Sequence, residues 1–247
     1  MARQRSLELP IKDDDSMNFQ IAKRIIDVTL ATLILLVSLP ALAIAALLIL
    51  VLEGRPVFYI SRRMVGLDRS VRIIKFRTMV RDAKSPKYRL NERFMRDGYL
   101  DIPRTCEVYT PIGRFLERIQ LVEVPQMLSV LFDGMSLIGN RPLPQENVRL
   151  LKKYRGWEQR FDSPAGISGI AQVVGKLKLD PADRLALECA YSDVYHSGNI
   201  VRCDILILLY TVKFILTSNG LTPEQAFRML GVRQRRMVAV KSAVGAM

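Results

Sequence analysis

The sequence predicts an α/β (α+β) protein on a membrane surface, with a Pro-kinked re-entrant membrane helix, a small β-hairpin and further helices on the cytosolic membrane face. Three observations predict this class. Residues 28–52 carry no charge, and Pro40 lies near the middle of that run. The stretch that follows, residues 54–104, carries 14 Lys and Arg against 5 Asp and Glu. An apolar segment followed directly by cations is typical of a membrane–water boundary.

The composition excludes several classes of protein. The chain has 247 residues, a net charge of +13, a hydrophobic content of 49%, three cysteines and one histidine. This length suits one domain or two small ones. The apolar content excludes a disordered chain, and three cysteines far apart exclude a disulfide scaffold. The single histidine, His196, argues against a His-based catalytic triad.

The uncharged run is two short halves joined at Pro40. Each half has 12 residues and would be about 18 Å long as a helix, less than the ~30 Å hydrocarbon core. Proline lacks the N–H and clashes with the carbonyl four residues back, here that of Leu36. We expect Ser38 to hydrogen-bond backbone groups that the kink frees. The run begins after charged residues and has no cleavage site, so it does not resemble a signal peptide.

The flanking charges favour a re-entrant helix. Lys23 and Arg24 precede the run, and Arg55, Arg62 and Arg63 follow it. The positive-inside rule places both clusters on the cytosolic side. A helix that dips into one leaflet and returns satisfies this rule at both ends. A straight spanning helix remains the alternative, and a buried helix of a soluble protein is the weakest of the three.

These features divide the chain into four parts. We expect a polar tail at 1–20, the re-entrant helix at 21–53, a cytosolic domain with interfacial helices at 54–220, and a basic C-terminal helix and tail at 221–247. Residues 205–216 form an apolar run that suits either an interfacial or a core helix. Thr222 and Pro223 open a short helix that ends before Gly231. The tail after it is basic and apolar, which suits an anionic membrane surface.

The basic stretch contains a predicted hairpin. Residues 57–60 and 71–76 read as strands, and 66–70 as their turn. Alternation places Lys75 and Arg77 on one face and Phe76 on the other. Two cations beside a membrane helix suit a phosphate or diphosphate, although a solvated strand face is the plainer interpretation. Nucleic acid is excluded as a partner because aromatic residues are only 7% of the chain and no binding motif is present.

A carboxylate and an arginine follow further along the chain. Thr110 and Pro111 predict the start of a helix that runs to about residue 120. Pro125 predicts a second helix to about residue 131, which would place Glu123 near its N-terminus, where the dipole favours an ionised carboxylate. The loop 133–142 ends at Arg141. Residues 166–169 and 172–176 read as a glycine-punctuated loop and strand, which bind phosphates in some proteins and are plain tight turns in others.

Taken in order, these blocks resemble one family, the bacterial sugar transferases, which are monotopic polyprenyl-phosphate glycosyl-1-phosphate transferases. The blocks are Lys23-Arg24, Asp27, Pro40, Lys75-Phe76-Arg77-Thr78-Met79, Glu123-Val124-Pro125-Gln126, Met135-Ser136-Leu137-Ile138-Gly139-Asn140-Arg141-Pro142, Gly166-Ile167-Ser168-Gly169 and Gln172-Val173. The resemblance covers about residues 17–220. It implies a re-entrant helix and a small domain on the cytosolic face of the bacterial inner membrane.

The resemblance also implies a reaction. The family moves a sugar-1-phosphate from a nucleoside-diphosphate sugar, usually a UDP-sugar, to polyprenyl phosphate, with Mg²⁺. The product begins a polysaccharide or another glycoconjugate. An aspartate in an Asp-Glu pair attacks the donor and forms a phosphosugar-enzyme intermediate.

The sequence departs from the family pattern at that aspartate. The family has L-D-E-x-P-Q, whereas this chain has Val122 before Glu123. Valine cannot attack phosphorus or ligate a metal. Nearby, the usual Gly-Asp is Asp133-Gly134, the usual G-P-R-P carries Asn140, and Ala165 replaces a proline. Several changes near one site indicate altered chemistry.

The carried-over site is therefore small. Glu123 is the candidate catalytic carboxylate and metal ligand. The candidate phosphate contacts are Lys75, Arg77, Arg141 and Gln126, and Asp133 is the candidate substitute carboxylate. Mg²⁺ is implied by the resemblance, but the missing aspartate puts it in doubt.

Three functional hypotheses remain open. In the first, the protein transfers the sugar or sugar phosphate directly, without a covalent intermediate, and one form of this reaction is glycosyl transfer to another acceptor. In the second, it performs the family reaction with Asp133 as the substitute carboxylate. In the third, it is an inactive scaffold for glycan assembly. The expected partners are a nucleotide-sugar donor, a lipid acceptor and an anionic membrane. A homo-oligomer and partner glycosyltransferases are both compatible with the sequence.

Overall fold

The computed structural model describes residues 13–96, 99–175, 179–217 and 219–231. Most of the expected polar tail (residues 1–12) and the expected basic tail (232–247) lie outside the described residues. The α-helices are α1 (Asp13–Leu52), α2 (Leu90–Phe94), α3 (Pro111–Arg118), α4 (Met127–Phe132), α5 (Gln145–Leu151), α6 (Ile170–Val174), α7 (Pro181–His196), α8 (Ile200–Thr217) and α9 (Pro223–Met229). The strands are β1 (Phe58–Met64), β2 (Ser70–Phe76), β3 (Met95–Arg96), β4 (Tyr99–Leu100), β5 (Ser136–Ile138) and β6 (Gly166–Ser168). Three 3₁₀ helices join them among the described residues, η1 (Pro86–Tyr88), η2 (Leu121–Gln126) and η3 (Trp157–Phe161).

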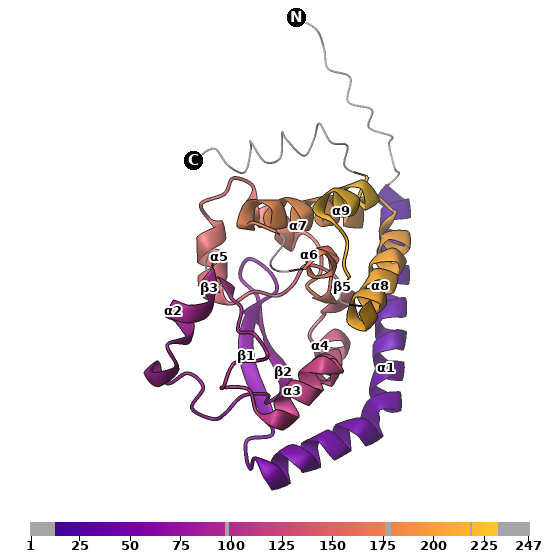
Figure 1. The fold of residues 1–247 in the computed structure, drawn as a ribbon. Coiled ribbons are helices and arrows are strands. Elements are labelled where there is room, and N and C mark those ends of the chain that lie inside the picture. Colours follow the sequence, from indigo (N-terminus) through magenta and orange to yellow (C-terminus); the bar gives the residue numbers. More distant parts are fainter. Residues whose placement is uncertain (1–12, 97–98, 176–178, 218, 232–247) are drawn as a thin grey trace, which may run out of the picture.

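Helix α1 is the largest element and its apolar side chains are mostly exposed. Among the described residues, Met17–Leu52 is the one stretch long and apolar enough to cross a membrane, and its most apolar part is only 11% buried. The helix begins at Asp13, inside the stretch expected to be a polar tail, and contains Pro40. Figure 1 shows α1 following one edge of the molecule and then changing direction below the other elements. This large exposed apolar surface is typical of a membrane contact.

A buried polar cluster attaches the first part of α1 to the rest of the molecule. Lys23 donates to the Ser136 hydroxyl at 2.6 Å, to the Ile138 carbonyl at 3.0 Å and to the Asp204 carboxylate. The Ser136 hydroxyl in turn donates to Asp27 at 2.6 Å. The Tyr191 hydroxyl donates to Asp204 at 2.7 Å. Lys23, Asp27, Ser136 and Tyr191, which are buried, and the half-buried Asp204 thus satisfy one another, as burial requires.

The hairpin β1–β2 is antiparallel and longer than expected. Its register pairs Tyr59 with Lys75, Ser61 with Ile73 and Arg63 with Val71. Residues directly opposite each other point to the same face of a hairpin. The register therefore places Tyr59, Arg63 and Lys75 on one face, and β2 packs against η2.

A short parallel pair, β5 and β6, forms the centre of the main core. Ser136 pairs with Gly166 and Ile138 with Ser168. A side chain at Gly139 would lie 2.2 Å from the Pro164 carbonyl, so only glycine allows this approach. Residues 170–174 form a helix, α6, so the strand expected at 172–176 was wrong. The run at 170–174 is short and apolar except for Gln172, and such a run does not distinguish a strand from a buried helix by pattern alone.

The capping signals were accurate. Thr110 caps α3 through the Gly113 N–H, with Pro111 as its first residue. Thr222 and Gln225 form a complete capping box on α9. Helix α8 lies beside the first part of α1 (Figure 1). It has a buried apolar face, as a core helix does, and an exposed apolar face, as an interfacial helix does. One face buries Ile200, Cys203 and Ile207, and the opposite face exposes Leu209 and Leu216 among others.

Candidate functional site

The 3₁₀ helix η2 holds the expected catalytic stretch. Pro125 lies inside η2, and α4 begins only at Met127, so Glu123 sits in the first turn of η2 rather than at the start of α4. Val122 is 1% exposed and packs in an apolar cluster with Ala45, Ile49, Phe76 and Leu116. Position 122, where the resemblance leads us to expect an aspartate, is therefore part of the core.

Glu123 is engaged in an ion pair. Its Oε1 accepts from Arg141 Nη2 at 2.8 Å, and the two side chains are 23% and 26% exposed. The Glu123 charge is the main cause that raises the pKa of Arg141. A partly exposed, charge-assisted pair of this kind fixes the direction of the guanidinium.

Lys75 and Arg63 lie on the hairpin face that meets this pair. Burial lowers the pKa of Lys75, while the Glu123 charge opposes that change. Burial and then repulsion from Arg141 lower the pKa of Arg63. Lys75 and Arg63 are thus within electrostatic range of the Glu123–Arg141 pair, and the packing of β2 against η2 brings the predicted Lys75 close to Glu123 and Arg141.

The sequence pattern does not mark Arg63 as a site residue. Its place after the uncharged run predicts only a membrane-flanking charge, because the first strand is expected to end at residue 60. The strand runs to Met64. Extending the alternation of Tyr59 and Ser61 by two residues would have placed Arg63 on the same face.

Arg77 lies at a different place from the other predicted phosphate contacts. Its Nη2 donates to the carbonyls of Glu53 at 3.1 Å and Gly54 at 3.0 Å. It also lies 3.5 Å from Glu53 Oε2. Arg77 therefore binds the carbonyls at the C-terminal end of α1, a position that favours cations.

Gln126 and Asp133 do not join the cation cluster in the same way. Gln126 is buried at the end of η2. Asp133 is the C-cap of α4, so the six residues of α4, about 9 Å of helix, separate it from η2. This geometry gives no support to Asp133 as a substitute nucleophile beside Glu123.

A second buried network holds the loop of Arg141. The Asn140 amide donates to the Arg160 carbonyl at 2.8 Å and to the Glu188 carbonyl at 2.9 Å, with the Ser163 and Ser192 hydroxyls each at 3.2 Å. Arg160 donates to the Arg141 carbonyl at 2.9 Å and pairs with Glu188 at 2.7 Å. Asn140, a departure from the family pattern, is thus the centre of a network that fixes the backbone of Arg141.

Of the residues expected at the kink of α1, Pro40 is exposed and Ser38 is half-buried. The Ser38 hydroxyl donates to the Ile34 carbonyl, four residues earlier. This bond is the common helix back-bond of serine; it does not use the Leu36 carbonyl that Pro40 leaves free. Ser38 therefore hydrogen-bonds a backbone carbonyl, but this carbonyl is that of Ile34 and is not one that the kink frees.

The donor set does not fit a protein-bound Mg²⁺. Within the described ranges, no group of three or more His, Cys, Asp or Glu side chains could hold a metal ion. Mg²⁺ prefers one or two carboxylates together with substrate phosphates. Here the Glu123 carboxylate is paired with Arg141, and Lys75 and Arg63 add positive charge that repels a divalent cation.

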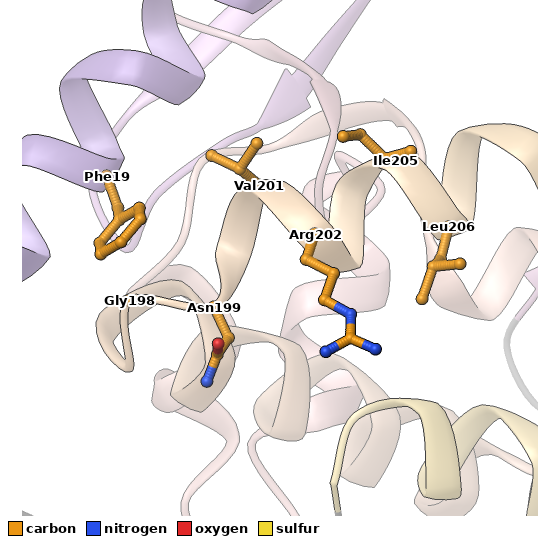
Figure 2. Close-up of a pocket in the computed structure, with 7 residues that line it drawn as sticks. All are labelled: Phe19, Gly198, Asn199, Val201, Arg202, Ile205 and Leu206. Carbon is orange, nitrogen blue, oxygen red and sulfur yellow. The ribbon is translucent and has the colours of Figure 1, made fainter.

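One pocket lies away from the predicted site residues. Figure 2 shows Phe19 of α1 facing the first turns of α8, where Val201, Arg202 and Ile205 lie. The cavity has a volume of about 400 Å³. None of the predicted site residues lines it, and its lining is mainly apolar, so it carries no evidence of chemistry.

Comparison with known proteins gives a consistent picture. A model of the bacterial sugar transferase family matches residues 18–218. The chain is 31% identical over 196 residues to the UDP-glucose:undecaprenyl-phosphate glucose-1-phosphate transferase of Escherichia coli (strain K12), covering 78% of this chain and 40% of that protein. It is 28% identical over 207 residues to the exopolysaccharide production protein ExoY of Rhizobium meliloti (strain 1021), covering 81% and 87%.

A third relative is similar to the same extent. It is the UDP-N-acetylgalactosamine-undecaprenyl-phosphate N-acetylgalactosaminephosphotransferase of Aeromonas hydrophila, 30% identical over 201 residues, which are 80% of this chain and 44% of that protein. The chain thus spans less than half the length of two of these relatives and most of the length of the third.

Proposed function

Because the chain belongs to the bacterial sugar transferase family, we propose that it transfers a sugar phosphate from a nucleoside-diphosphate sugar to polyprenyl phosphate, in polysaccharide or glycoconjugate biosynthesis. The observation that carries this proposal is the group of Arg63, Lys75 and Arg141 around Glu123. Cations in a partly buried site suit the diphosphate of such a donor.

The proposed reaction is a direct displacement. An oxygen of the acceptor phosphate attacks the donor phosphorus that carries the sugar. The bond from that phosphorus to the bridging oxygen breaks, and the nucleoside monophosphate leaves with the electron pair. Catalysis of this kind relies on positioning and charge stabilisation, which the cations supply. No side chain at position 122 is needed as a nucleophile.

Glu123 has two roles in this proposal. It orients Arg141 through their ion pair. It is also the carboxylate of this group that could accept the proton of a singly protonated acceptor phosphate, whose second pKa is about 6. A general base of this kind must lie within hydrogen-bond reach of the proton it removes.

The membrane arrangement belongs to the same proposal. We take α1 to be a re-entrant helix, bent at Pro40, whose two ends return to the cytosolic face of the inner membrane. Its change of direction (Figure 1) and its exposed apolar side chains support this arrangement. The exposed face of α8 then lies at the lipid surface, and the acceptor headgroup meets the cation site at that boundary.

The test is a product analysis with the purified full chain. The protein is incubated with UDP-sugars and undecaprenyl phosphate, and the released nucleotide is identified by mass spectrometry. Release of UMP with a lipid-linked diphosphate sugar supports the proposal. Release of UDP indicates glycosyl transfer to another acceptor instead. A phosphosugar adduct on the intact protein would contradict direct displacement.

A second candidate is a non-catalytic scaffold. The burial of Val122 in an apolar cluster favours it, because the family pattern has its nucleophile at that position. Absence of turnover with every UDP-sugar, together with absence of donor binding, would favour the scaffold over both enzyme hypotheses.

A further inference from the structure

We propose that the site binds the donor diphosphate directly on Arg63, Lys75 and Arg141, without a divalent cation. This inference rests on the proposed function, since it concerns how the same site holds its donor. Arg63 is thereby a phosphate-binding residue beside Lys75 and Arg141. The positive charges of these three side chains take the place of a metal ion.

The hairpin geometry brings the three cations together. Arg63 and Lys75 share one face of β1–β2, as the register shows. Next to Arg63, the Met64 N–H donates to the Leu143 carbonyl at 2.7 Å. That bond fixes β1 beside the loop that carries Arg141, two residues before Leu143. Arg63 is further held by a hydrogen bond of 3.3 Å from its Nε to the Ser61 hydroxyl.

The charges around the site are unbalanced in favour of an anion. Arg63 and Arg141 repel each other, and both also repel Lys75. Glu123 compensates one of these three positive charges. The half-buried Glu117 also acts on Lys75 and Arg141. The exposed Glu146 acts on Arg63, and water screens an exposed carboxylate strongly.

A nucleotide-sugar diphosphate matches this imbalance. Each of its two phosphates carries one negative charge, so it can pair with Arg63 and Lys75, whereas Glu123 is paired with Arg141. Guanidinium groups bind such oxygens in bidentate fashion.

The experiment is a binding titration with UDP as the probe. Isothermal titration calorimetry on the full chain in detergent is run in EDTA and again in excess Mg²⁺. We expect the same dissociation constant within about twofold. We expect Arg63→Gln to weaken UDP binding about tenfold or more, as the loss of a charge-assisted contact does.

Arg62→Gln is the matched control. Arg62 is exposed on the opposite face of β1, where it pairs with Arg72, and the substitution removes the same charge one residue away. UDP binding that weakens equally in both variants would overturn the assignment of Arg63, because only the overall charge would then matter. A thermal melt of each variant verifies that it is folded.

The outcomes separate this inference from the proposed function. UDP binding that needs Mg²⁺ overturns the metal-free site and leaves the transferase proposal standing. UDP binding in EDTA without any product in the turnover assay supports the site and contradicts the transferase. Absence of UDP binding in both buffers overturns both.

Discussion

Val122 and Glu123 are chain neighbours in opposite environments. Val122 is buried against Ala45 and Ile49 of α1, whereas Glu123 is partly exposed and faces Arg141. The side chain at position 122 therefore stabilises the contact between α1 and the site. The side chain at position 123 contributes to the charge of the site. A change at either residue should act through a different property, stability in the first case and binding or turnover in the second.

Val122→Asp should destabilise the protein rather than create a nucleophile. A carboxylate among these apolar side chains has its pKa raised by desolvation. A shift of about three units would cost about 4 kcal/mol. Because the folded-state pKa would lie above the unfolded value, the loss should grow as pH rises from about 4 toward that raised pKa. Thermal melting of both proteins at pH 4.5 and 7.5 measures it.

Val122→Thr is the control for this substitution. It has nearly the same shape but carries no charge, so its loss of stability should be smaller and independent of pH. A Val122→Asp protein as stable as the parent at pH 7.5 would mean that position 122 reaches solvent, contrary to its 1% exposure.

Among the elements, the loop after β5 depends on a distant network. Asn140, at the end of that strand, contacts η3 and α7, and Arg160 from η3 holds the Arg141 carbonyl. A proline at position 140 would restrict the backbone of this loop by itself. In this chain, hydrogen bonds from Asn140 to η3 and α7 hold the loop instead.

Asn140→Ala should weaken donor binding more than it slows turnover. The Arg141 backbone loses its support, so we expect KM for the donor to rise about fivefold with a smaller change in kcat. The buried carbonyls left without a donor should also cost about 1–3 kcal/mol of stability. Steady-state kinetics and melting measure both effects.

Asn147→Ala is the matched control for that prediction. Asn147 is another buried asparagine, on α5. Its replacement should lower stability without raising KM. Equal changes in KM for the two variants would show that Asn140 acts only through general stability.

The contact between α1 and α8 depends on pH through Asp204. Burial raises the pKa of Asp204 to about 6, while Lys23 opposes that rise. Asp27 on α1 and Tyr191 on α7 face the same cluster. The folded state therefore holds the Asp204 proton more tightly than the unfolded chain, whose carboxyl has the ordinary value of 3.8.

The sign of this effect is testable. The contribution of Asp204 to the free energy of unfolding should fall as pH rises from about 4 to about 6, by an amount on the order of 3 kcal/mol, and then level off. Melting curves of the parent and Asp204→Asn, recorded across that range, should diverge in slope. Identical pH slopes would contradict the prediction.

For the whole molecule, the re-entrant arrangement predicts which side of the membrane each end of α1 occupies. The described cysteines, Cys106, Cys189 and Cys203, are buried. An introduced cysteine on the surface can therefore be labelled selectively. Met17 and Leu67 are 61% and 47% exposed on either side of the apolar run.

A re-entrant helix predicts the same labelling at both positions. Met17→Cys and Leu67→Cys should both resist a membrane-impermeant maleimide in intact cells and react in inverted vesicles. A straight spanning helix would expose one of the two to the outside of intact cells. Labelling of just one position from outside would therefore overturn the re-entrant arrangement.

Several features of this protein follow from the sequence alone because their causes are local. The uncharged run with Pro40, the caps at Thr110 and Thr222 and the alternation around Lys75 depend on residues within a few positions. The family follows from blocks that lie in a fixed order along the chain. The end of β1 lies at Met64 rather than at the predicted residue 60, because pairing with β2 extends the strand.

The tertiary structure decided what local pattern does not contain. Arg63 enters the site through its cross-strand register, and Arg77 binds the end of α1 because that end folds back beside β2. Val122 is buried because α1, β2 and α3 meet there. Each of these facts depends on partners far along the chain, whose free energy of contact exists only once the fold has brought them together.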